Sequence, residues 1–156
     1  MIKYYFGDKQ RLFLALLERM SNRQLTSFQA VLNAPDPIRA FIEATLDFFS
    51  RNPPMVRLVV DEVLSGDSPL RQAFIQMAPT RIATLLPRLI SAQQQAGTIR
   101  HDLDPKWAAF SLISLIMAPF ILGPARELAW DISSDEIASS YWADHIYRLF
   151  SEGVRR

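Results

Sequence analysis

Acidic side chains at helical spacing are the first residues of this chain that could do chemistry. Glu43 and Asp47 lie four residues apart, so both carboxylates would share one face of a helix, where a pair can act as general acid and base. Arg39 and Arg51 fall on the same row. A solvated ladder of ion pairs is therefore the interpretation that we favour over a catalytic pair.

The sequence gives little indication of a metal site or of a catalytic nucleophile. His101 and His145 lie far apart and in no Glu-x-x-His or His-Glu-x-x-His pattern, and Asp61 with Glu62 is a lone acidic pair. The absence of cysteine excludes disulfides, thiolate catalysis and cysteine-based zinc sites. No glycine-rich phosphate loop or nucleophile elbow occurs. We expect no enzyme, no metal site and no cofactor.

Composition indicates one globular domain. The 156 residues are 49% hydrophobic and 21% charged, which argues against disorder. The formal net charge is +1, and the positive charge is concentrated in the first 24 residues. The apolar run from 107 to 124 is short for a membrane span and contains Pro119, so it predicts a buried helix. With no secretory signal visible, we expect a cytoplasmic protein without a membrane segment.

The elements that would position these side chains are helices. Apolar spacing predicts a long amphipathic helix from Asp8 to about Asn33. A capping residue directly before a proline then marks four helix starts, because proline at the first helical position loses no needed hydrogen bond. These pairs are Asp36-Pro37, Asn52-Pro53, Ser68-Pro69 and Asp104-Pro105.

Glycines and a capping box mark the other helix boundaries. Gly66, Gly97 and Gly123 follow periodic segments, where a helix end favours positive φ. Ser133 and Glu136 stand at capping-box spacing, and a single last helix is predicted from there through residue 150. Pro79 and Pro87 should kink or split the helix between residues 68 and 95. The fold predicted is all-α, with about six helices.

Residues 2–12 carry the most specific pattern in the chain. An aliphatic residue is followed by aromatics, a variable position, Asp-Lys, two variable positions and Leu. This pattern resembles the junction between the recognition helix and the following helix in the TetR/AcrR family of transcriptional regulators. Residues 97–105 resemble the loop before the eighth helix of many members. The matching junction residues are Ile2, Tyr4, Tyr5, Phe6, Asp8, Lys9 and Leu12.

The resemblance implies a TetR-like C-terminal ligand-binding and dimerisation domain over residues 8–156. Residues 1–7 would be the remnant of a recognition helix and the junction of a DNA-binding domain. The positions matched by Tyr4 and Lys9 commonly contact DNA phosphate in the family, and a helix start after Asp8 favours an anion there. Members carry two further helices before this point, so we expect the intact parent, but not these residues alone, to bind an operator selectively in a gel-shift assay.

The family's small-molecule site would lie among the middle helices. Aromatic and flexible apolar side chains there suit a small hydrophobic effector, with a few polar groups to orient it. For any single apolar residue, plain core packing is the more common role. The candidate lining residues are Phe48, Phe49, Met55, Leu58, Glu62, Phe74, Met77, Arg81, Trp107, Phe110, Ser111 and Ser114.

The resemblance also implies a homodimer formed by the last two helices. The all-round apolar helix from 107 and the aromatic stripe of the last helix support it, because so much apolar surface would otherwise be exposed. The candidate interface residues are Ile113, Met117, Phe120, Ile137, Tyr141, His145 and Phe150.

The leading hypothesis is thus the sensor and dimerisation part of a TetR-like DNA-binding regulator, and more specifically of a repressor. The alternative is an all-α protein that binds a hydrophobic ligand and has no role on DNA. An in-frame helix-turn-helix encoded upstream would decide for the regulator.

Overall fold

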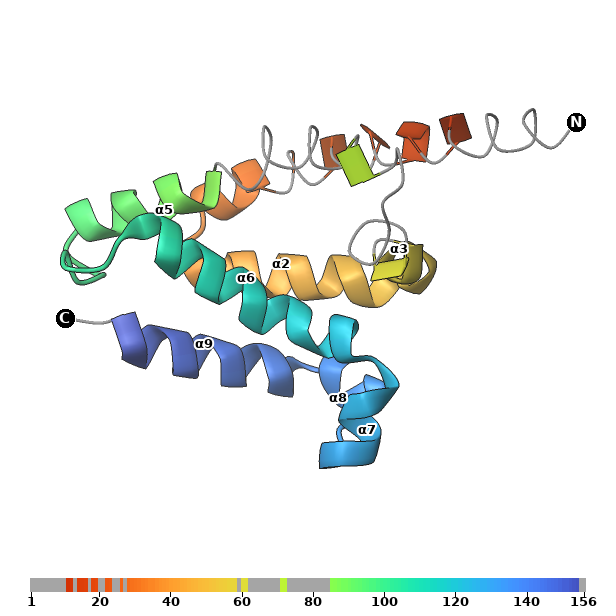
Figure 1. The fold of residues 1–156 in the computed structure, drawn as a ribbon. Helices are drawn as coiled ribbons and strands as arrows, with labels where there is room; N and C mark the ends of the chain where they lie inside the picture. Colours follow the sequence, from red (N-terminus) through yellow and green to blue (C-terminus); the bar gives the residue numbers. More distant parts are fainter. Residues whose placement is uncertain are drawn as a thin grey trace, which may run out of the picture.

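A computed structural model describes residues 11–12, 14–16, 18–19, 22–23, 26, 28–58, 60–61, 71–72 and 85–154. Every regular element in these ranges is helical, so the predicted all-α class is confirmed (Figure 1). The described residues between 11 and 32 are helical, as their apolar spacing predicts, and Phe28 at the end of this segment packs edge-on against Phe41. Asp8, the predicted N-cap, lies outside the described residues.

Two of the predicted capping pairs start helices as expected. In α2 (Pro37–Arg51) the Asp36 side chain accepts a hydrogen bond from the backbone N–H three residues on, at 3.2 Å. In α6 (Pro105–Leu122) the Asp104 side chain accepts one from the backbone N–H two residues on, at 2.8 Å. These bonds satisfy amides that the first helical turn leaves unpaired.

The short helix α3 (Pro53–Leu58) begins where predicted. Asn52 Nδ2 donates to the Phe48 carbonyl at 2.7 Å, which closes the end of α2. The chain thus passes directly from α2 into α3 through one residue.

Glycines end two helices as predicted. Gly97, with φ 81°, follows α5 (Leu85–Gln95), and Gly123, with φ 49°, ends α6. Pro87 lies in the first turn of α5. Gly66, the start at Ser68 and the expected kink at Pro79 lie outside the described residues. A helix that the sequence reasoning missed, α7 (Pro124–Trp130), follows Gly123 immediately.

The prediction of a single last helix was wrong. The capping box of Ser133 and Glu136 is present, but the helix it starts, α8 (Ser134–Ala138), ends at once. Ser139 is extended, its hydroxyl donates to the Glu136 carbonyl at 2.6 Å, and it accepts from the Tyr141 N–H at 3.3 Å. A serine side chain that bonds the backbone in this way competes with the helix. The chain then resumes as α9 (Ser140–Val154).

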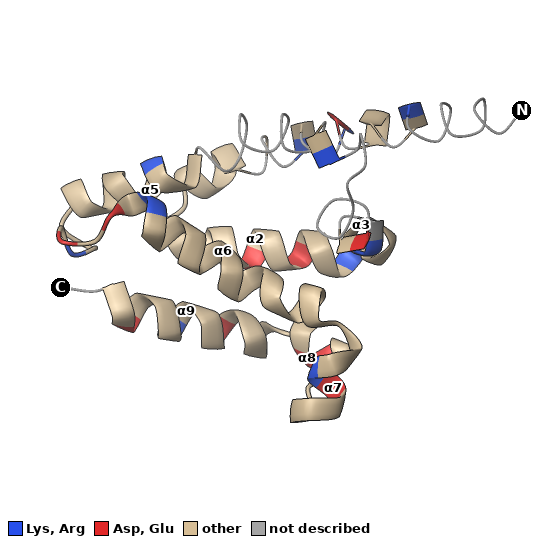
Figure 2. Ribbon diagram, viewed as in Figure 1, with Lys and Arg blue, Asp and Glu red and all other residues tan. Residues whose placement is uncertain are grey.

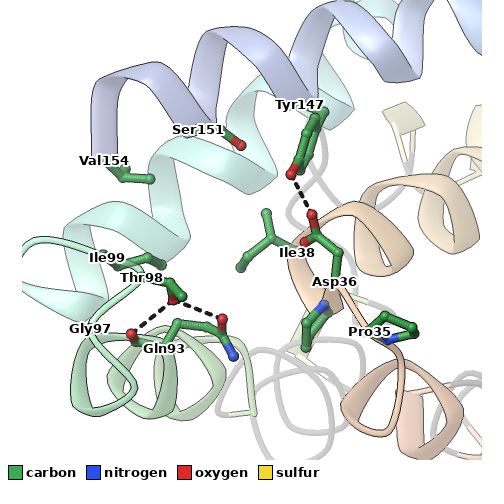
Figure 3. A pocket seen from close by; sticks show the side chains of 11 residues that line it. Pro35, Asp36, Ile38, Gln93, Gly97, Thr98, Ile99, Tyr147, Ser151 and Val154 are labelled. Carbon is green, nitrogen blue, oxygen red and sulfur yellow. Dashed lines mark hydrogen bonds between the residues drawn. The ribbon is translucent and has the colours of Figure 1, made fainter. Parts of the chain in front are cut away.

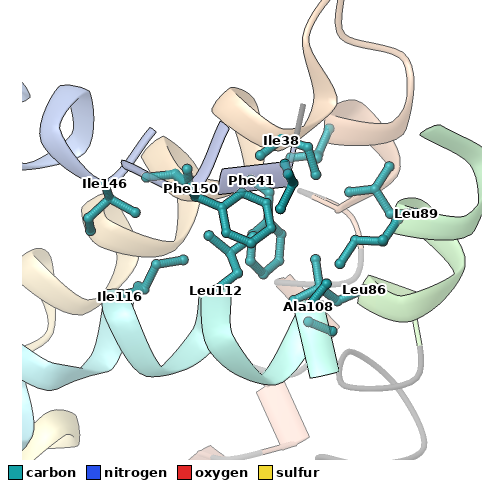
Figure 4. Close-up of a cluster of buried hydrophobic side chains, with 14 of the residues drawn as sticks. Ile38, Phe41, Leu86, Leu89, Ala108, Leu112, Ile116, Ile146 and Phe150 are labelled. Atoms are coloured by element: carbon teal, nitrogen blue, oxygen red, sulfur yellow. The ribbon is translucent and has the colours of Figure 1, made fainter. Parts of the chain in front are cut away.

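One core lies between α2, α5, α6 and α9 (Figure 4). Burying each large aliphatic side chain there contributes roughly 1.5–3 kcal/mol to folding, before the loss of conformational entropy. The largest fully buried side chains in the described ranges are Ile42, Leu86, Ile90, Leu112, Ile116 and Ile146.

Helix α6 was predicted from its apolar sequence to be buried, and within the described part of this chain only one of its faces is covered. Its residues Ala108, Ala109, Leu112, Ile116 and Pro119 are buried, while other apolar residues of the same helix are exposed. After Lys106 the helix carries no charge (Figure 2). By length and composition it could cross a membrane, and its buried face packs in the core.

Polar contacts join the start of α2 to α9, which lies far from it in the sequence. The Arg39 guanidinium bonds Glu43 at 2.9 Å and reaches Asp144 on α9, and it lies 5.2 Å from the centre of the Tyr147 ring. The Tyr147 hydroxyl donates to Asp36. The partners of Arg39, first Glu43 and then Asp144, raise its pKa above the ordinary value. The predicted ion-pair ladder on α2 is confirmed by this pair and by the one between residues 51 and 47.

Candidate functional site

Several predicted site residues fall where the structure gives no description. The predicted phosphate contacts Tyr4 and Lys9 are among them. Met55 and Leu58 lie on α3, but their side chains are not described. The predicted lining residues outside the described ranges are Glu62, Phe74, Met77 and Arg81.

A half-buried aromatic cluster joins the carboxyl ends of α2 and α6. The ring centres of Phe48 and Phe49 lie 5.4 Å apart in an edge-to-face arrangement, and the ring of Phe49 lies 5.5 Å from that of Phe120. Such pairs are worth roughly 0.5–1.5 kcal/mol beyond their burial. Phe48 and Phe49 were predicted to line a ligand site. Phe120 was predicted at a dimer interface, and the structure places its ring against α2.

The remaining candidates for the ligand site lie on an outward face of α6. Trp107 is 70% exposed and Phe110 is 65% exposed, with ring centres 6.4 Å apart, and Ser111 and Ser114 are exposed on the same helix. Phe110 and Phe120 are ten residues apart on one helix, or about 15 Å along its axis. The lining candidates whose side chains the structure describes therefore lie in two groups, one on α2 and one on α6.

The exposed apolar surface spreads over α6, α7 and α9. Tyr141 and His145, predicted at a dimer interface, are exposed on α9, and Ile113 and Met117 are half-buried on α6. The His145 ring stacks on Trp142 with ring centres 5.3 Å apart. Large apolar side chains that are exposed to solvent are candidates for contact with another molecule. Those on these three helices, called the apolar face below, are Trp107, Phe110, Ile121, Leu122, Leu128, Trp130, Tyr141 and Leu149.

Two predicted interface residues belong to the interior of the chain instead. Ile137 and Phe150 are buried, and Phe150 packs in the core beside Ile146 (Figure 4). An apolar stripe on a helix has the same spacing whether it faces its own core or a partner, and here the stripe of α9 faces inward. These two side chains are therefore covered by the chain itself.

A cleft of about 430 Å³ opens between the turn before α2, the loop after α5 and the end of α9 (Figure 3). Tyr147 and Asp36 form one wall through their hydrogen bond, and Thr98 bonds Gln93 on another. Ser151, on α9, is buried and also lines the cleft. None of the predicted ligand residues lines this cleft, whose walls come from three segments that lie far apart in the sequence.

The described chain is thus an all-α domain with a half-buried aromatic cluster at one end and a broad apolar face, an arrangement suited to binding other molecules. A family model described as "Tetracyclin repressor-like, C-terminal domain" matches residues 35–148. The chain belongs to this family and is a TetR-family transcriptional regulator. Regulators of this family are typically dimeric, bind DNA and are not enzymes.

The comparison with individual proteins also points to a transcriptional regulator. The chain is similar to the HTH-type transcriptional repressor NicS of Pseudomonas putida, with 28% identity over 167 aligned residues that cover all of this chain and 76% of that protein. No solved structure matches the chain. The family match favours the regulator over the alternative of a ligand-binding protein with no role on DNA, and it indicates a soluble protein of the cytoplasm.

Proposed function

We propose that this chain is the effector-sensing and dimerisation part of a TetR-like repressor, and that its effector is a small hydrophobic molecule. The observation that carries the proposal is the aromatic cluster of Phe48, Phe49 and Phe120. These rings are only partly buried and lie at the carboxyl ends of α2 and α6, next to α3. An apolar ligand that covers them would remove further aromatic surface from water.

The effector proposal is tested by titrating a broad panel of lipophilic compounds while tryptophan fluorescence and melting temperature are recorded. A ligand at a hundred times its Kd stabilises the folded state by about 2.7 kcal/mol. Phe49→Leu should weaken the response, because it removes an aromatic ring and keeps an apolar side chain. Phe110→Leu makes the same change on the exposed face of α6 and should leave the response intact. A chain that responds to no compound, or equal losses in both variants, would contradict the proposed site.

The apolar face supports the second part of the proposal, a homodimer through α6 and α9. Four of its aromatic side chains, each offering on the order of 150–250 Å² when fully exposed, are at least 64% exposed. They alone present roughly 500 Å², against about 800 Å² per partner in a standard interface. Light scattering at micromolar concentration should report twice the mass of the chain. A monomer at that concentration would contradict the proposed homodimer.

Binding to DNA is proposed for the intact protein, with Tyr4 and Lys9 on the phosphate backbone. In a protein that includes the helix-turn-helix, Lys9→Ala should weaken operator and non-operator DNA about equally. It should also reduce the slope of log K against log salt by about 1, because one fewer counterion is released. An unchanged slope would argue that Lys9 is only a solvated charge.

A further inference from the structure

Helix α7 presents an apolar surface that the described part of the chain leaves uncovered. None of its seven residues is buried, and Leu128 is 89% and Trp130 64% exposed. A helix of this length is not stable by itself in water, so something other than its own packing must hold it. No role was predicted for α7 from the sequence.

Hydrogen bonds hold α7 in place at its ends. The Arg126 guanidinium donates to the Ile132 carbonyl at 3.4 Å and to the Ser134 hydroxyl at 2.6 Å, which joins α7 to the start of α8. Asp131 ends the helix in the left-handed conformation, and the Ile132 N–H returns to the Arg126 carbonyl. The segment is therefore a fixed protrusion with apolar side chains, and a fixed surface loses little entropy when it binds.

The exposed stripe of α6 has a spacing that suits pairing with a second copy. Trp107 lies seven residues before Ser114 and Ile121 lies seven residues after it, so the stripe is symmetric about Ser114. The Ser114 hydroxyl donates to the Phe110 carbonyl at 2.7 Å, so it needs no water and can be covered at little cost. A two-fold axis through this small residue would set the two α6 helices antiparallel, with Trp107 of each copy beside Ile121 of the other.

We propose that α7 is an intersubunit arm that docks on the amino-terminal end of α6 of a second copy. In the antiparallel pair, the end of α6 lies beside Trp107 of the second copy. Because α7 follows that end after Gly123 alone, the proposal places Leu128 and Trp130 against the same region. The proposal rests on the proposed dimer and adds its orientation and its outermost contact. The arm supplies two of the eight large residues of the apolar face. Trp130 is already counted among the four aromatic side chains above, so Leu128 is the apolar residue that the arm adds to that area.

The absence of cysteine from the sequence allows a direct cross-linking test. Lys106 and Ala129 are exposed neighbours of the proposed contact, and replacing them keeps all the apolar side chains in place. The double variant K106C/A129C of the full chain, treated with a short bismaleimide, should give a covalent dimer on a denaturing gel. The single variants K106C and A129C should give none. Covalent dimers from both single variants would instead show a parallel pair and overturn the proposal.

A second measurement separates this proposal from the dimer itself. Leu128→Ala and Trp130→Ala should each raise the dimer Kd at least tenfold in sedimentation equilibrium, while Leu32→Ala, at an exposed leucine that is not part of the apolar face, should leave it unchanged. A dimer whose Kd ignores both arm variants and whose double variant does not cross-link would refute the arm and leave the proposed dimer standing. A chain that is monomeric at micromolar concentration would refute both.

Discussion

Phe110 distinguishes the two surfaces that were predicted from the sequence, because it was expected to line a ligand site and lies on the apolar face instead. Its side chain is 65% exposed. If a phenylalanine offers about 200 Å², roughly 130 Å² would be buried in a dimer, worth about 3 kcal/mol at ~25 cal/mol per Å². A homodimer carries the substitution in both copies, so Phe110→Ala removes up to about 6 kcal/mol per dimer and should raise the dimer Kd by up to roughly ten-thousandfold, since each 1.4 kcal/mol is about a factor of ten.

Sedimentation equilibrium over a range of concentrations measures this Kd directly. The variant should keep the melting temperature of the monomer, because the side chain makes few contacts within the chain. Leu12→Ala, at an exposed apolar position of the amino-terminal helix, serves as the control. An unchanged dimer Kd together with a lost response to lipophilic compounds would refute the reasoning. That result would instead favour Phe110 as a residue that lines the ligand site.

Three further predictions concern stability. Leu112→Ala, at a fully buried position of α6, should cost about 2–5 kcal/mol and lower the melting temperature by roughly 5–15 °C, measured by circular dichroism. Tyr147→Phe removes the hydrogen bond to Asp36 and should cost about 0.5–1.5 kcal/mol in urea unfolding, where no loss would show the bond to be inconsequential. The Ser133 backbone N–H, followed by its hydroxyl, lowers the pKa of Glu136. The charged capping box therefore stabilises the fold above the ordinary pKa of a glutamate and loses this effect as pH falls through the lower folded value. Glu136→Gln should flatten the acid-induced loss of stability below the ordinary pKa of a glutamate. An identical pH profile in the two proteins would contradict this.

The helix starts could be predicted because they depend on local chemistry. Asp36 and Asp104 cap their helices through side-chain bonds that span two or three residues, and the Ser133 capping box is equally local. Ser139 shows the limit of such reasoning. Its hydroxyl breaks the last helix, yet a serine at this spacing is common within helices, and nothing in the neighbouring sequence marks the break.

The site was harder to predict because it depends on which helix face meets the core. Trp107 and Phe150 are both aromatic residues on apolar helices, but the first is exposed and the second is buried. That difference follows from how α2, α5, α6 and α9 pack together. The residue spacing within a single helix does not predict this packing. Leu128 and Trp130 were missed for a related reason, since α7 is short and shows no periodic pattern.

The position of α9 in the core also governs how the domain can be made in the cell. Ile146 and Phe150 complete a core whose other walls come from helices up to a hundred residues earlier, and the bonds of Arg39 and Tyr147 close the same long separation. During synthesis, α5 and α6 can pair early because they are neighbours in sequence. The part of the apolar face of α2 that packs against α9 stays uncovered until α9 has been synthesised, so the nascent chain exposes this surface after α5 and α6 have formed.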